Sequence, residues 1–153
     1  MQDIPEQEAI AITSRRTICE DAGDWVPLKS PKGASRIRCG VTDEQGVNVG
    51  LYVELLYLMG PQTHIPKYKL TLFRSTTHGP ERIYQLHVEK LRKVPRHWHF
   101  MAHEHMGDGR HVGAPQWLNW KWSQIIGRFS DKSGVKFLPK DVVDPGLFEL
   151  KGQ

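Results

Sequence analysis

The sequence has few cysteines and no long hydrophobic run, and each shortage excludes a class of protein. Cys19 and Cys39 are too few for a disulfide scaffold or a zinc–thiolate site, so we expect two small buried residues. The apolar run 51–59 is interrupted by Glu54 and is too short to cross a bilayer. The first residues lack the basic-then-apolar order of a secretion signal, so we expect a cytoplasmic protein without a membrane partner.

Acidic residues are also in the minority. The 21 lysines and arginines exceed the 17 aspartates and glutamates, which gives a formal net charge of +4. This balance favours a polyanionic partner such as nucleic acid, although surplus lysines on a solvated surface would give the same count. The length of 153 residues fits one ordinary domain.

Alternating apolar and polar residues predict antiparallel strands from residue 35 onward. The first strand, 35–41, and a return strand, 47–59, are joined by a turn-rich tetrapeptide. A third strand follows at 67–72, a fourth at 84–89 and a fifth at 96–105. Because the connections between successive strands are short, we expect a meander.

The segment 117–129 is the best helix candidate, because its apolar residues recur at helical spacing and its polar residues face away from them. The sequence therefore predicts an α+β fold, an antiparallel meander sheet of about five strands with one C-terminal helix packed on one face. We assign this single domain to 35–137. A partly ordered N-terminal arm, 1–34, precedes it, and a strap or tail, 138–153, follows it.

Histidines are concentrated in the fifth predicted strand. Because strand side chains alternate between two faces, His97, His99, His103 and His105 would share one face. His87 on the preceding strand would join them. Imidazoles exchange protons near neutral pH, bind transition metals and bond phosphate oxygens, so this histidine face is the candidate site.

The first hypothesis for this face is metal-free phosphodiester chemistry. One histidine would act as general base and another as general acid, while a cation stabilises the charge that develops on phosphate. We assign the catalytic role to His97, His99, His103 and His87. The residues expected to contact the nucleic acid are Lys67, Lys69, Arg36, Arg38, Arg110, Trp120, Lys121 and Arg128.

The second hypothesis is a metal site. Histidines two residues apart on a strand stand about 7 Å apart on one face, so His97 and His99, with His87 as a third ligand, would hold zinc or another divalent transition metal. No spacing reproduces a specific zinc signature such as His-Glu-x-x-His. The third explanation is that polar side chains only solvate an exposed sheet face or contact a partner protein.

Three motifs occur in order along the second half of the chain: Lys-Tyr-Lys-Leu at 67–70, Arg-Ile-Tyr at 82–84, and a histidine-rich segment that ends in Gly-Asp-Gly-Arg-His at 107–111. This order, followed by an aromatic helix, resembles the TumE-type toxins of bacterial toxin–antitoxin systems over residues 67–130. The resemblance implies a growth-inhibiting small protein that acts on RNA and is neutralised by a DNA-binding antitoxin.

We therefore expect a small bacterial or mobile-element protein that acts on nucleic acid through its histidine face, with a toxin-type ribonuclease as the enzymatic form. The alternative is a non-catalytic binding protein, such as a phage-encoded inhibitor, that occupies a nucleic-acid or protein site with its basic surface. An enzyme should lose turnover on His99→Ala and keep its fold. A binder should instead lose affinity through several surface charges.

Overall fold

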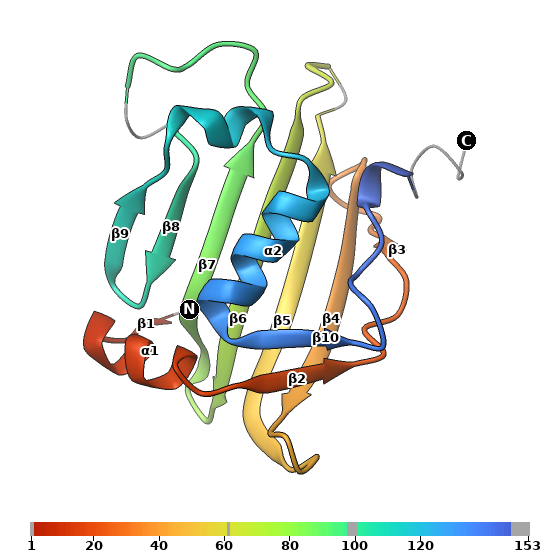
Figure 1. Ribbon diagram of the computed structural model, residues 1–153. Coiled ribbons are helices and arrows are strands. Elements are labelled where there is room, and N and C mark those ends of the chain that lie inside the picture. The colour runs from red at the N-terminus through yellow and green to blue at the C-terminus, as the bar shows by residue number, and fades with distance from the viewer. Residues whose placement is uncertain (1, 61, 98–100, 148–153) are drawn as a thin grey trace.

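The computed structural model describes residues 2–60, 62–97 and 101–147, in which a large sheet carries helices on one side (Figure 1). The strands are β1 (Gln2–Asp3), β2 (Thr17–Glu20), β3 (Val26–Pro27), β4 (Ala34–Thr42), β5 (Asn48–Met59), β6 (Pro66–Thr76), β7 (Gly79–Glu89), β8 (His103–Met106), β9 (Gly109–Val112) and β10 (Val135–Leu138). The helices are α1 (Glu6–Thr13), the 3-10 helix η2 (Pro115–Asn119) and α2 (Trp122–Ser133). Hydrogen-bonded neighbours follow the order β10-β2-β4-β5-β6-β7-β8-β9, with β1 beside β7 and β3 beside β4.

The predicted fold class is wrong in the size and make-up of the sheet. Instead of about five antiparallel strands and one helix, the described residues form a mixed sheet of ten strands. The sheet is mixed because β10 runs parallel to β2 and β1 runs parallel to β7. Four of the added strands, β1, β2, β3 and β10, are only two to four residues long. Segments this short show too little alternation to be recognised in a sequence.

The N-terminal segment, which we expected to be a partly ordered arm, contributes β1, α1, β2 and β3, and its Ile4 and Trp25 are buried in the core. We expected Cys19 and Cys39 to be two small buried residues. Cys19 is buried, but Cys39 is only partly buried, and the two form a disulfide that we did not expect. The bond forms because β2 lies antiparallel beside β4, where Ile18 pairs with Thr42. No local pattern in the sequence indicates that these two strands pair.

The end of the described chain lies against the core as a strap. The indole Nε1 of Trp25 donates to the backbone oxygen of Val143 at 2.7 Å, and that of Trp122 donates to the oxygen of Val142 at the same distance. Val142 is itself buried. These contacts position the part of the predicted tail that precedes residue 148.

The fifth predicted strand is shorter than its alternation indicates. Residues 90–97 form a loop after β7, and β8 begins only at His103. Pro95 has no backbone N–H to donate to a strand ladder, which disfavours a strand through this loop. His97 lies in the loop and is exposed, and His99 lies outside the described residues.

The two faces of the sheet differ in what covers them. In Figure 1, α1, η2 and α2 lie on the same side of the sheet. Ile125 and Phe129 of α2 are buried there, and the Phe129 ring centroid lies 5.9 Å from that of Tyr84 on β7. On the opposite side of β4 to β9, the described part of the chain places no helix. We call this side the open face.

Candidate functional site

The open face is arranged in rows because antiparallel neighbours stand directly opposite one another. Two adjacent rows each cross the sheet from β4 to β9. The first row contains Arg36, Leu56, Lys69, His87, His103 and Val112. The second row contains Arg38, Glu54, Thr71, Gln85, His105 and Arg110. Histidines and cations that are distant in the sequence therefore become neighbours on one surface.

Three histidines form the centre of this surface, and we call them the imidazole cluster: His87, His103 and His105. The ring centroids of His87 and His103 are 5.0 Å apart, and those of His103 and His105 are also 5.0 Å apart. All three side chains are half-buried. Cross-strand pairing brings His87 to His103, and strand alternation adds His105. The cluster therefore combines two predicted catalytic residues with one that we had placed on the face but not in the site.

The imidazole cluster is uncharged at pH 7. Burial lowers the pKa of His87 to about 4, and repulsion from the protonated form of His103 and from the charge of Lys69 adds to the effect. Burial also lowers the pKa of His105 to about 4, together with the positive charge of Arg82. The pKa of His103 is lowered in the same direction, again mainly by burial. Each ring therefore has one nitrogen lone pair that can accept a proton.

A backbone contact determines which nitrogen of His103 is the base. Its Nδ1 lies 2.9 Å from the backbone oxygen of Met101. A carbonyl oxygen can only accept, so Nδ1 donates and carries the hydrogen in the neutral ring. The lone pair is then on Nε2. His103 is therefore the member of the cluster whose structure best suits a general base.

Cations flank the cluster on both sides. Lys69 stands opposite His87, Arg110 stands opposite His105, and both side chains are exposed. Two other predicted nucleic-acid contacts on this face are ion-paired: Arg38 Nη2 lies 2.5 Å from Glu54 and Lys67 Nζ lies 3.5 Å from Glu89. Lys69 and Arg110 are the cations that stand directly opposite imidazoles of the cluster, so they are the residues placed to contact a phosphate there.

A buried polar network supports the second row. Gln85 Nε2 donates to Thr71 Oγ1 at 2.8 Å, and both residues are 3% exposed. Arg82 Nη1 donates to Gln85 Oε1 at 3.1 Å, and its other nitrogens donate to both carboxylate oxygens of Asp3. The N-terminal strand therefore orders the residues beside His105. Sequence reasoning missed this role of Arg82 because Asp3 is so distant in the chain.

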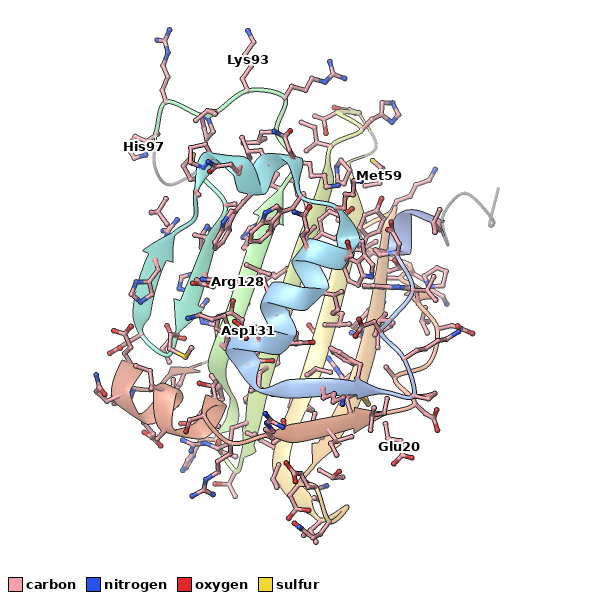
Figure 2. All side chains as sticks on the ribbon, in the orientation of Figure 1. Glu20, Met59, Lys93, His97, Arg128 and Asp131 are labelled. Carbon is pink, nitrogen blue, oxygen red and sulfur yellow. A yellow bond between two sulfur atoms is a disulfide. The ribbon has the colours of Figure 1, made fainter. Side chains whose placement is uncertain are left out.

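Three predicted nucleic-acid contacts belong to the other side of the sheet. Arg128 lies on α2 (Figure 2), and its Nη2 and Nε donate to the carboxylate of Glu104 at 2.6 and 3.1 Å. Trp120 stacks on Trp117 with ring centroids 4.5 Å apart. Lys121 is the N-cap of α2. The structure therefore separates these residues from the imidazole cluster by the thickness of the sheet.

The glutamate that Arg128 contacts is part of a buried triad. Glu104 is 7% exposed and accepts a 2.6 Å hydrogen bond from the hydroxyl of Tyr84. Burial alone would raise the pKa of Glu104, but the hydrogen bonds from Arg128 and Tyr84 outweigh it and hold that pKa below its usual range. The triad therefore joins α2 to β7 and β8 as a structural unit.

The predicted metal ligands do not come together in the described residues. His87 is in the imidazole cluster, whereas His97 is in the loop beyond the end of β7 (Figure 2). His99, the other predicted ligand and catalytic residue, is not among the residues described. Within the described ranges, no group of three or more histidine, cysteine, aspartate or glutamate residues is arranged to hold a metal ion.

No family model, curated protein or solved structure matches the chain. The resemblance to TumE-type toxins therefore stays a prediction that rests on its motifs. The described residues include no helix that is both long enough and apolar enough to pass through a membrane.

Proposed function

We propose that the protein binds single-stranded RNA across the open face and cleaves it at the imidazole cluster without a metal ion. The observation that supports this most is the direct pairing of His87 with His103, with Lys69 and Arg110 beside them. Neutral imidazoles next to cations can accept a proton and stabilise a phosphate at the same time. A broad sheet face suits a splayed single strand better than a duplex, whose bases are read in its grooves.

The proposed reaction uses the ribose 2′-hydroxyl as its nucleophile. His103 Nε2 takes the proton from this hydroxyl, O2′ attacks the adjacent phosphorus, and the bond from phosphorus to O5′ breaks. A water molecule protonates the departing O5′, and His103 Nε2 then returns its proton to the solvent. Lys69 and Arg110 stabilise the charge on the phosphoryl oxygens. The products are a 2′,3′-cyclic phosphate and a 5′-hydroxyl, so DNA, which lacks the nucleophile, is not a substrate.

A second proposal is a binding protein without catalysis. It is favoured by the pKa values of His87 and His105, which are about 4, so that neither residue is an imidazolium acid in the free protein at pH 7. Such a protein would occupy RNA, or a protein site of similar charge, through the same open face. In either form we propose a cytoplasmic location and, following the TumE resemblance, an antitoxin partner.

Cleavage of a labelled single-stranded RNA in the presence of EDTA tests the proposal, with a DNA of the same sequence as the second substrate. We expect the wild type to cleave only the RNA and to leave a cyclic phosphate. His103→Gln should lower the rate by about a hundredfold or more, the usual scale for a general base. His78→Gln, which changes an exposed histidine in the turn between β6 and β7, is the matched control.

The outcomes separate the alternatives. Cleavage that EDTA abolishes would replace the acid–base mechanism with the metal hypothesis. RNA binding without cleavage would favour the non-catalytic protein. Absence of both binding and cleavage, with the far-ultraviolet circular dichroism of a folded sheet, would contradict both proposals.

A further inference from the structure

The loop 90–97, which we call the basic loop, has a high density of positive charge. It contains Lys90, Arg92, Lys93 and Arg96 and no acidic residue. The side chains of Arg92, Lys93 and Arg96 are exposed, and Figure 2 shows Lys93 projecting beyond the ends of the strands. No ion pair within the described ranges neutralises these three cations. The loop therefore presents its charge to the solvent.

The start of the basic loop has a fixed position at the end of β7, with the Lys90 side chain on the side of the sheet that α2 covers, because Tyr68 packs against Trp122 with ring centroids 5.8 Å apart. The backbone N–H of Lys90 donates to the oxygen of Pro66 at 3.0 Å, and the ammonium of Lys90 lies 5.6 Å from the centre of the Tyr68 ring. Lys90 follows His87 by three residues, which corresponds to about 10 Å along a strand. The loop therefore continues directly from the end of β7, the strand that carries His87 of the imidazole cluster.

Charge at the opposite ends of the strands has the other sign. The β4–β5 hairpin, α1, the start of β7 and the β8–β9 turn meet at that end. Of the arginines there, Arg74 and Arg82 are paired with acids, and Arg15 and Arg16 line a hollow together with Glu8 and Asp43, so the acidic residues still outnumber these four arginines. The acidic residues of this end are Asp3, Glu6, Glu8, Asp43, Glu44, Glu81 and Asp108. A polyanion on the open face is therefore repelled at one end of the strands and attracted at the other.

We propose that the basic loop binds phosphates of the same RNA strand that lies at the imidazole cluster, on one side of the cleaved nucleotide. This inference rests on the proposed function and adds the class of ligand: a strand of several nucleotides, held by its backbone and independent of its bases. Lysine and arginine contacts to phosphate position a strand without reading its sequence. A dinucleotide bound at the cluster is too short to reach the loop.

The test compares RNA affinity and its salt dependence for the wild type and Arg92→Gln/Lys93→Gln/Arg96→Gln. A control variant, Arg15→Gln/Arg16→Gln/Lys136→Gln, removes the same charge from exposed residues near the junction of β2 and β10. The ligands are a dodecamer and a dinucleotide of 2′-O-methyl uridine, which have no free 2′-hydroxyl and are not cleaved. Fluorescence anisotropy gives each affinity.

We expect the loop variant to bind the dodecamer at least tenfold more weakly and the dinucleotide as the wild type does. Log affinity for the dodecamer falls as log salt rises, and this negative slope should become shallower by about 2. Each phosphate contact on a single strand accounts for about 0.7, and the variant loses three cations. Equal dodecamer slopes for the loop variant and the control would overturn this inference alone. A wild type that binds neither ligand would instead overturn the proposed function. The single variant Lys93→Glu repeats the test if the triple variant is unstable.

Discussion

The residues of the imidazole cluster show how a sheet surface changes the chemistry of histidine. A solvated imidazole is partly charged near neutral pH, but His87 and His105 have pKa values of about 4 because they are half-buried among cations. The groups that face them are His103, Lys67, Lys69, Arg82, Arg110 and Asp3. A bound phosphate would oppose this positive charge and favour protonation. Binding of an anion and uptake of a proton are therefore coupled at this site.

The same pKa values predict a loss of stability in mild acid. In the unfolded chain a histidine has a pKa of about 6.5, so between pH 6.5 and pH 4 the unfolded state binds more protons than the folded state. The stabilising contribution of His87 and His105 is therefore complete above pH 6.5 and decreases as the pH falls toward 4. We expect the melting temperature to fall over this range, and to fall less in His87→Gln/His105→Gln. His78→Gln is the control, and equal pH slopes in all three proteins would contradict the assignment.

Single residues also show the limits of the sequence prediction for the site. Alternation correctly placed Lys69, His87 and His103 on one face, because each lies within a strand. It failed for His97, because alternation does not reveal where a strand begins. Histidines at alternate positions give the same sequence pattern whether they lie inside a strand or beyond its end. His105 was on the predicted face, and only its ring contact with His103 indicates that it belongs to the site.

At the scale of elements, the triad of Arg128, Glu104 and Tyr84 attaches α2 to the sheet. We expect Arg128→Met to lower the free energy of unfolding by about 2 to 3 kcal/mol, because the buried carboxylate of Glu104 loses its cation. This value is below that for a fully buried pair, since the Arg128 side chain is 32% exposed. Urea denaturation measures the change. RNA affinity should not change, because Arg128 lies on the side of the sheet opposite the open face.

A double variant distinguishes the triad from a general effect on α2. Arg128→Met/Glu104→Leu removes both charges and should recover part of the lost stability. Two apolar side chains leave no buried carboxylate without a cation. Lys132→Met, in the same helix, should change the stability by less than about 1 kcal/mol. If RNA affinity falls in a stable Arg128→Met protein, the sequence-based assignment of Arg128 to nucleic-acid binding is correct instead.

Long elements were predictable and short ones were not. Strands β4 to β7 are nine to twelve residues long, so their alternation extends over several periods. The amphipathic stripe of α2 is equally clear, with Ile125 and Phe129 buried as the pattern indicates. The bounds of the predicted helix 117–129 are wrong, because its first residues belong to η2 and α2 runs from Trp122 to Ser133. By contrast, β2 and β10 are four residues each and are strands because of the neighbour they pair with. Such pairing is a property of the tertiary structure.

At the scale of the whole molecule, the disulfide attaches the N-terminal segment to the meander. Cys19 and Cys39 are 20 residues apart, and a cross-link over a loop of this length stabilises a protein by about 3 kcal/mol. We expect reduction, or Cys39→Ser, to lower the melting temperature clearly. Mass spectrometry after thiol alkylation measures whether the bond is present, and reductant should have no effect on Cys39→Ser. Such bonds persist mainly in oxidising compartments, so alkylation in intact cells also tests the cytoplasmic location.

The pairing of β2 with β10 has a consequence for the synthesis of the chain. These strands form a parallel ladder from Val135↔Thr17 to Leu138↔Glu20, so one edge of the sheet joins segments from opposite ends of the described sequence. A ribosome adds residues in order, and contacts between distant segments form late and slowly. While β4 to β7 can already fold as consecutive neighbours, β2 keeps an unprotected edge until translation passes Leu138. The nascent chain therefore completes its sheet only after Val135–Leu138 has been synthesised.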